Sequence, residues 1–318
     1  MQTPRIGATS GVVNGILYVA GGAYGSSVLS SVEAYNPATN TWSYKAPLPA
    51  PVTNLVPGQA GVLNGMLYVV GGWCCSGNGQ DFSTVYAYDP VSDSWASKAS
   101  LPSPREQASI AVVGGILYAI GGSTEGVGII ADVEAYDPST DTWTAKAPLP
   151  VARWASVTGV VDGIIYVVAG NDINTAATTT TYAYDPSTDT WTTKAPMPTG
   201  QDSATGGVIN GILYVAGGGV PAGALNTVQA YNPGADKWLE MSPMPTARFY
   251  LSSGVIGNTL YALGGTTQGA YASYYALATN EAFTSPLQTK DDCKDGGWQK
   301  LGFRNQGQCV SFINHNGN

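Results

Sequence analysis

The chain has little charge and few basic residues. Only 11% of its 318 residues are charged, against roughly 25% for an average soluble protein. The 13 Lys and Arg are outnumbered by 21 Asp and Glu, which gives a formal net charge of −8. Nucleic-acid binding depends mainly on basic side chains that neutralise phosphates, so nucleic acid is not an expected partner. Gly and Asn interrupt each hydrophobic stretch before it reaches 18 residues, and we therefore expect no membrane span.

Metal ligands are also scarce. The single histidine is His315, and the four cysteines include no Cys-x-x-Cys spacing, so we expect neither a metal site nor a cofactor. The first residues, MQTPRIGATSG, lack the basic start and apolar core of a secretory signal. This leaves either a cytoplasmic protein or one whose leader has been removed, and the composition favours the second.

What the chain does contain is one unit repeated six times over nearly all of residues 5 to 285. The third copy, residues 105 to 149, reads REQASIAVVGGILYAIGGSTEGVGIIADVEAYDPSTDTWTAKAPL, and the others follow its plan at a period of about 48 residues. The copies share a glycine pair, found at 21–22, 71–72, 121–122, 217–218 and 264–265 and replaced by Ala-Gly at 169–170. A period of this length decides the architecture of the whole chain.

Each copy predicts a four-stranded antiparallel sheet. In four of the copies, Asn-Gly or Asp-Gly between the first two apolar segments favours a type I′ hairpin. Asp-Pro or Asn-Pro ends the third strand, and the fourth opens at a tryptophan. One such sheet cannot bury both faces, whereas six arranged radially can. The expected fold is therefore all-β, a six-bladed β-propeller over residues 1–285, followed by a separate tail over residues 286–318.

The succession of glycine pair, tyrosine and tryptophan resembles the Kelch repeat over about nine tenths of the chain. The residues that carry the resemblance are Tyr35, Tyr88, Tyr136, Tyr184, Tyr231, Trp42, Trp95, Trp143, Trp191 and Trp238. It implies a six-bladed Kelch propeller in which these rings pack between blades. Copy six departs from the pattern and places Ala282 or Phe283 where the tryptophan is expected. We expect residues near 275 to 285 to complete blade six, without an outer strand from residues 1 to 5.

Residues repeated from blade to blade are interpreted as scaffold, including Arg5, Arg105, Arg153 and Arg248. Function is expected where the copies differ. In Kelch domains, the loops that enter the innermost strands and those that leave the glycine pairs gather around the axis on one face, which usually binds the ligand. The resemblance places there the aromatic residues Trp73, Trp154, Phe249 and Tyr250 and the polar residues Glu106, Gln107, Asn171, Asp172 and Asp202.

Aromatic walls with a few carboxylates and amides suit a sugar or a cation better than an anion. The leading hypothesis is an extracellular, monomeric binding module for a carbohydrate, another small polar ligand or a partner protein. The alternative is that these residues line a funnel around the axis that binds only water and no ligand.

Two further classes of function stay open. The first class is an enzyme, because Kelch propellers include enzymes. The copper site of galactose oxidase needs histidine ligands, and the only histidine of this chain is His315, in the tail. Glu106 and Asp202 could instead act as acid and base in epimerase-like chemistry. The second class is a pure interaction scaffold, as in the Kelch adaptors of ubiquitin ligases.

The cysteines form two groups. Cys74 and Cys75 are adjacent in the loop GWCCSGNGQD at the mouth of the predicted pocket, and they form either a vicinal disulfide or two thiols. Cys293 and Cys309 bracket a Gly-rich loop that a disulfide would stabilise by roughly 3 kcal/mol. The segments CKDGGWQ and FRNQGQCVSF resemble cysteine-paired tails of exported bacterial proteins. This resemblance implies a location outside the cytoplasm. The alternative is a surface extension with reduced cysteines.

Overall fold

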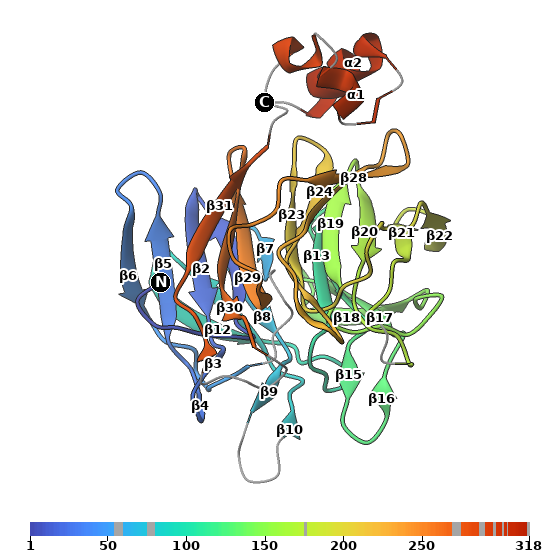
Figure 1. Cartoon of the computed structure of the whole chain (residues 1–318). Coiled ribbons are helices and arrows are strands. Elements are labelled where there is room, and N and C mark those ends of the chain that lie inside the picture. The colour runs from blue at the N-terminus through green and yellow to red at the C-terminus, as the bar shows by residue number, and fades with distance from the viewer. Residues whose placement is uncertain are drawn as a thin grey trace.

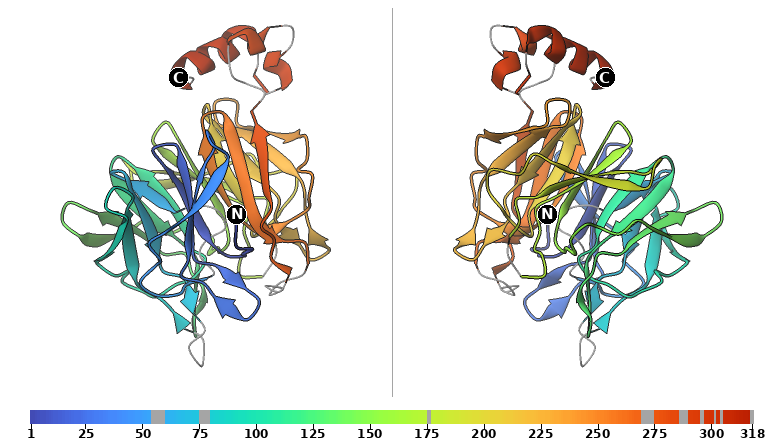
Figure 2. Two further views of the ribbon diagram at one scale, coloured as in Figure 1. Left: turned by 90° about the vertical axis from the view of Figure 1, so that its left-hand side faces the viewer. Right: turned by 90° about the vertical axis from the view of Figure 1, so that its right-hand side faces the viewer.

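The structure is a computed structural model that describes residues 1–53, 60–74, 80–174, 177–268, 275–285, 290–294, 297–300, 302–303 and 305–316. Six antiparallel sheets stand around a common axis as the blades of a propeller, and a small helical tail lies beyond one face (Figure 1; Figure 2). The predicted all-β, six-bladed fold is confirmed. No helix in the described part of the chain is long and apolar enough to cross a bilayer.

Five blades have four strands each, ordered from the axis outward. Blade one contains β1 (Thr9–Val13), β2 (Ile16–Ala20), β5 (Val32–Asn36) and β6 (Thr41–Lys45). Blade two contains β7 (Gly61–Leu63), β8 (Met66–Val70), β11 (Val85–Asp89) and β12 (Ser94–Lys98). Blade three contains β13 (Ser109–Val113), β14 (Ile116–Ile120), β17 (Val133–Asp137) and β18 (Thr142–Lys146). Blade four contains β19 (Val157–Val161), β20 (Ile164–Val168), β21 (Thr181–Asp185) and β22 (Thr190–Lys194). Blade five contains β23 (Thr205–Ile209), β24 (Ile212–Ala216), β27 (Val228–Asn232) and β28 (Lys237–Met241).

Blade six differs from the other five. It contains β29 (Phe249–Ile256), β30 (Thr259–Thr266) and β31 (Asn280–Thr284), and it has no fourth strand among the described residues. Phe283 pairs with Leu260, just as Tyr35 pairs with Leu17 in blade one. The expectation that Ala282 or Phe283 replaces the tryptophan is therefore wrong, because Phe283 replaces the third-strand tyrosine. Residues 1 to 5 add no outer strand, as predicted.

Short ribbons follow the glycine pairs in four blades. They are β3 (Ala23–Tyr24) with β4 (Ser27–Val28), β9 (Trp73–Cys74) with β10 (Gln80–Asp81), β15 (Ser123–Thr124) with β16 (Gly128–Ile129), and β25 (Gly219–Val220) with β26 (Gly223–Ala224). Those labelled in Figure 1 project from the face opposite the tail. We call the face that carries the ribbons the loop face.

The recurrent aromatic residues pack between blades as predicted. The rings of Tyr136 and Trp143 lie 5.1 Å apart, and the Trp143 indole donates to the carbonyl of Ala99 in blade two at 2.8 Å. The Tyr136 hydroxyl donates to Asp141 at 2.6 Å, and the same carboxylate accepts the Ala99 amide at 2.9 Å. Equivalent bonds link blades one to two, three to four and four to five. The same pair of bonds, from a tryptophan indole and to an aspartate carboxylate, therefore joins successive blades.

These turn aspartates predict loss of stability in acid. Hydrogen bonds from Tyr136 and then from Ala99 lower the pKa of Asp141, and the pKa values of Asp93 and Asp189 are lowered in the same way. A lowered folded-state pKa gives stability that is present above the unfolded pKa of about 3.9 and is lost as pH falls through the folded value.

We expect Asp141→Asn to flatten the decline in stability below about pH 4, measured by urea unfolding at a series of pH values. Asn40 occupies this position in blade one, where it accepts the Tyr35 hydroxyl at 3.0 Å, so asparagine fits the turn. An unchanged slope of stability against pH in the variant would contradict this role for Asp141.

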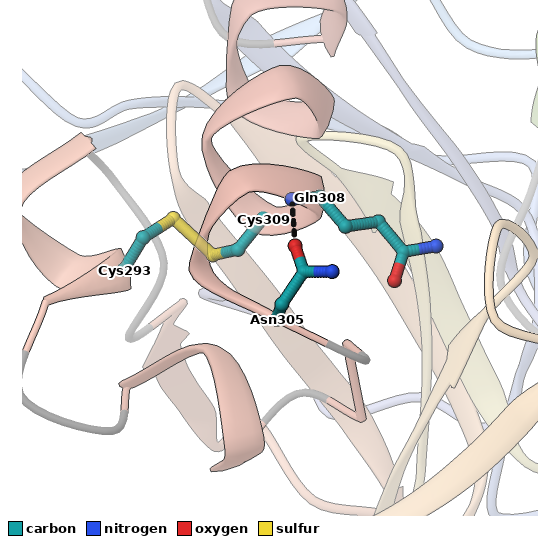
Figure 3. Close-up of a disulfide and its surroundings, with 4 residues drawn as sticks. All are labelled: Cys293, Asn305, Gln308 and Cys309. Carbon is teal, nitrogen blue, oxygen red and sulfur yellow. Dashed lines mark hydrogen bonds between the residues drawn. A yellow bond between two sulfur atoms is a disulfide. The ribbon is translucent and has the colours of Figure 1, made fainter.

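The tail consists of the 3-10 helix η2 (Lys290–Cys293), α1 (Gly297–Lys300) and α2 (Gln306–Asn316). Cys293 and Cys309 form a disulfide with a Cα–Cα distance of 5.8 Å, which confirms the predicted bridge and ties η2 to α2 (Figure 3). Asn305 accepts the backbone amide of Gln308 at 2.8 Å in the first turn of α2 (Figure 3). Both cysteines and Phe303 are buried in a cluster that also contacts Leu239 of β28, so the tail packs against the outer strand of blade five.

Candidate functional site

The two sets of loop residues singled out in the sequence meet on the loop face. In each blade, the residue after the arginine position pairs with the residue after the glycine pair. The pairs are Ile6 with Ala23, Thr53 with Trp73, Glu106 with Ser123, Trp154 with Asn171, Asp202 with Gly219, and Phe249 with Thr266. In blade two, counting back from the hairpin turn indicates Val56 and Pro57, but Thr53 takes this place, and Val56 and Pro57 lie outside the described residues.

The second glycine of each pair makes this close pairing possible. These glycines have φ between 80° and 104°. A Cβ on Gly122 would lie 2.6 Å from the carbonyl oxygen of Glu106, and one on Gly218 would lie 2.7 Å from that of Asp202. A side chain at either glycine would therefore push the site residues away from their partners.

In the five blades other than blade two, the next residues along the chain are joined by backbone hydrogen bonds from blade to blade around the axis. Gly7, Gln107, Ala155, Ser203 and Tyr250 all have φ between 51° and 59°. The Tyr250 amide donates to Ser203 at 2.9 Å, Ser203 to Ala155 at 3.3 Å, Ala155 to Gln107 at 3.2 Å, and Gly7 to Tyr250 at 3.3 Å. These inter-blade bonds hold the neighbouring site residues at fixed positions around the axis.

Blades three to five supply three of the predicted polar residues: Gln107, Asn171 and Asp202. Asn171 and Ser203 donate to the Asp202 carboxylate, while burial raises the pKa of Asp202 overall. In these three blades, the buried polar atoms without a hydrogen-bond partner include Gln107 Oε1, Trp154 Nε1, Ser156 Oγ, Asn171 Oδ1, Gln201 Nε2 and Thr205 Oγ1. An unsatisfied buried polar group costs about 1 to 3 kcal/mol, so such a cluster calls for an explanation. A ligand with matching donors and acceptors would supply one.

Blade six supplies the aromatic side of the same cluster. A Cβ added to Gly219 would lie 3.6 Å from Asp202 Oδ1 and 3.7 Å from the ring of Phe249. Phe249 is buried, and its ring packs 5.1 Å from that of Tyr250, which is more exposed. The Asp202 carboxylate and the Phe249 ring therefore flank a position that has no side chain. The role of Gly219 was missed in the sequence, where the triple glycine at residues 217–219 was the available signal.

The other predicted site residues lie elsewhere on the loop face. Trp73 is half-buried at the base of the β9–β10 ribbon, and Glu106 is half-buried in blade three. Asp172 is half-buried beside Asn171, and its charge acts to raise the pKa of Arg153, although burial lowers that pKa overall. Cys74 is buried in β9. Cys75 lies outside the described residues, so the bond between these two cysteines stays a prediction.

The recurrent arginines are structural, in line with their repetition. Arg5 pairs with Glu33, Arg105 with Glu134 and Arg248 with Glu281, at 2.6, 2.6 and 2.9 Å. In blade four the partner is an aromatic ring, because Arg153 lies 4.8 Å from the centre of Tyr182. Within the described residues, no cluster of three His, Cys, Asp or Glu side chains could hold a metal ion.

Comparison with known proteins gives two kinds of match. A family model of the Kelch motif matches residues 4–49, 57–102, 104–150, 155–198 and 203–245. Kelch-like protein 25 of Xenopus tropicalis is 32% identical over 134 residues, which cover 39% of this chain and 22% of that protein. Kelch-like ECH-associated protein 1A of Danio rerio is 34% identical over 108 residues, which cover 34% of this chain and 18% of that protein. The matched region thus spans less than a quarter of either relative.

A solved structure of YjhT superposes with a TM-score of 0.76, covering 89% of this chain and 95% of that chain. The sequence identity is 19%, so this likeness concerns the fold alone.

Proposed function

Because the chain belongs to the family of Kelch-motif proteins, we propose that its propeller is a binding module whose loop face takes a small polar ligand, a carbohydrate foremost. One observation carries the proposal: Gln107 Oε1, Trp154 Nε1 and Asn171 Oδ1 are buried without partners, and Asn171, which pairs with Trp154, donates to the Asp202 carboxylate. Phe249 and Tyr250 adjoin this group. We call these six residues the axial cluster.

The chemistry of the axial cluster favours a hydroxylated ligand. The indole of Trp154 needs an acceptor, whereas the amide oxygens of Gln107 and Asn171 need donors. A sugar hydroxyl can both donate and accept, and the apolar face of a sugar ring can stack on an aromatic side chain. An anionic ligand fits less well beside Asp202 in a chain with a net charge of −8.

A glycan array followed by a thermal-shift screen should identify a ligand that raises the melting temperature. With that ligand, Trp154→Ala is expected to weaken binding by about 2 kcal/mol or more, roughly 30-fold, because it removes a central aromatic residue. Asn171→Ala should also weaken binding, since it removes an acceptor and a donor to Asp202.

The matched control is Tyr24→Ala, which removes an aromatic residue that is 45% exposed in the β3–β4 ribbon of the same face. Isothermal titration should show its affinity unchanged. Equal affinity of the wild-type protein and the folded Trp154→Ala variant for every ligand found would contradict the proposed site.

Acid-base catalysis by the same cluster is a second candidate, favoured by the raised pKa of the buried Asp202. Asp202→Asn keeps the shape of the side chain. In an enzyme that uses Asp202 for proton transfer, this change should lower turnover of the bound ligand about 100- to 10,000-fold at similar affinity. In a binding module it should change affinity alone.

We also propose that the protein works outside the cytoplasm, and the Cys293–Cys309 disulfide supports this because such bonds persist in oxidising compartments. A non-reduced digest of freshly isolated protein should contain the two tail peptides joined. Cys293→Ala with Cys309→Ala should loosen the tail by roughly 3 kcal/mol and leave the melting temperature of the propeller unchanged. Quantitative alkylation of both cysteines without reductant would contradict the location.

A further inference from the structure

Gly219 leaves a space on the loop face between a carboxylate and an aromatic ring. The residue after the glycine pair carries a side chain in the other five blades, whereas blade five has a glycine there. A Cβ added to Gly219 would lie 3.6 Å from Asp202 Oδ1 and 3.7 Å from two ring carbons of Phe249, and these are the nearest atoms outside its chain neighbours. The space therefore accepts a ligand group of the size of a methyl or an ammonium.

The backbone of Gly219 does not require a glycine. Gly217 and Gly218 have φ of 67° and 101°, values that side chains rarely adopt, but Gly219 has no positive φ and lies in β25. A side chain at this position would therefore fill the space without backbone strain. What distinguishes Gly219 is the room that it leaves beside Asp202.

Asp202 is a partly buried carboxylate without a cation. Asn171 and Ser203 donate to it, and no ion pair within the described ranges includes it. The third-strand glutamates of blades one, three and six, by contrast, each have an arginine partner at 2.6 to 2.9 Å. In blade five the arginine position holds Gln201, a neutral side chain that accepts a hydrogen bond from Gln229 at 3.0 Å. Burial raises the pKa of Asp202, and a ligand cation would offset the cost of its charge.

The Phe249 ring favours a cation in the same space. Two ring carbons at 3.7 Å place the ring centroid within about 6 Å, the range over which a cation is attracted to an aromatic ring. An ammonium would also make a charge-assisted hydrogen bond to Asp202, which is stronger than the bond from a neutral hydroxyl. The net charge of −8 adds a general attraction for cations.

Asn171 connects this space to groups that bind hydroxyls. An ionised carboxylate only accepts hydrogen bonds, so the Asn171 amide nitrogen faces Asp202, and Asn171 Oδ1 is left buried without a partner. Asn171 pairs with Trp154, whose indole nitrogen also lacks a partner. An acceptor and a donor for hydroxyl groups therefore lie on residues next to the carboxylate.

We propose that the loop face selects an amino sugar, with its protonated amine at Gly219 between the Asp202 carboxylate and the Phe249 ring and a hydroxyl on Asn171 Oδ1. This inference rests on the proposed function and narrows the carbohydrate to one with a free amine. Gly219 and Asp202 determine the specificity: Gly219 leaves room for the amine, and Asp202 balances its charge. N-acetylation of the sugar removes the charge and adds bulk, so acetylated sugars are discriminated against.

The test compares the free amine, the N-acetyl form and the parent hexose for glucosamine, galactosamine and mannosamine. Isothermal titration near pH 6, below the pKa of aliphatic amines, should show at least one free amine binding about tenfold or more tightly than its acetylated and parent forms. Asp202→Asn keeps the shape of the side chain but removes its charge, so it should abolish this preference.

Gly219→Ser tests the space itself, and blade three supplies its precedent. There Ser123 stands opposite Glu106, as Gly219 stands opposite Asp202. The added serine would fill the space, so affinity for the free amine should fall about tenfold or more while the melting temperature of the unliganded protein stays the same. The matched control is Glu125→Gln, which removes one negative charge from an exposed residue of the same face and should leave the preference for the amine unchanged.

The outcomes separate this inference from the proposed function. A parent or acetylated sugar that binds as tightly as its amine would overturn the amino-sugar assignment and leave the carbohydrate site standing. A preference for the amine that survives both Asp202→Asn and Gly219→Ser would place the amine elsewhere and overturn the assignment as well, as would a preference lost equally in Glu125→Gln. If none of these sugars binds, this inference fails, and the glycan array decides the proposed function by itself.

Discussion

Replacing Glu134 with alanine is expected to lower the free energy of unfolding by about 3 to 5 kcal/mol, the cost of leaving a buried charge without its partner. Glu134 lies 2.6 Å from Arg105, whose side chain is fully buried. The remaining bonds of Arg105, to the carbonyls of Gly121 and Asp132, are long at 3.3 and 3.4 Å. Chemical denaturation at pH 7 would measure the loss.

The repeat itself offers the matched control. Blade two carries Val52 and Tyr86 at the two equivalent positions, and both belong to one apolar cluster. The double variant Arg105→Val with Glu134→Tyr should recover most of the stability lost in Glu134→Ala, because replacing a buried ion pair by packed apolar groups is often neutral or stabilising. If the double variant is as unstable as Glu134→Ala, the loss does not come from the unpaired charge.

Gly122→Ala is expected to cost about 3 kcal/mol or more, since it adds backbone strain to a clash in a packed site. Gly122 has φ of 104°, and its added Cβ would lie 2.6 Å from the Glu106 carbonyl oxygen and 3.1 Å from the Ala108 nitrogen. Neither atom belongs to a flexible side chain that could move away. Thermal and urea unfolding would quantify the loss.

Gly115→Ala, in the hairpin turn of the same blade, separates the two causes. Gly115 has φ of 80°, but an added Cβ would meet nothing within 4 Å. This control should therefore lose only the conformational part, about 1 kcal/mol. Equal losses for the two variants would show that the close approach to Glu106 contributes nothing.

The site was predicted less completely than the fold. The differences between copies pointed to Trp154, Asn171 and Asp202, and the structure brings these residues together. The sequence could not show that burial raises the pKa of Asp202 or that the Asn171 oxygen lacks a partner, because both depend on residues from other blades. Gly219 was missed for a related reason, since the space it leaves matters only beside Phe249.

The sequence by itself determined the number of blades, the hairpins within each blade and the aromatic packing between blades, because these are local features that recur from copy to copy. Asn14 and Gly15, for example, have the positive φ values that their turn requires whatever lies around them. The cysteine spacing in the tail similarly led to the observed Cys293–Cys309 bridge. Only the tertiary structure decided the register of blade six, where Phe283 lies on the third strand and the described residues provide no fourth strand. The physical reason is that strand order and cavities depend on pairing between segments far apart in the chain, which a degenerate repeat no longer specifies.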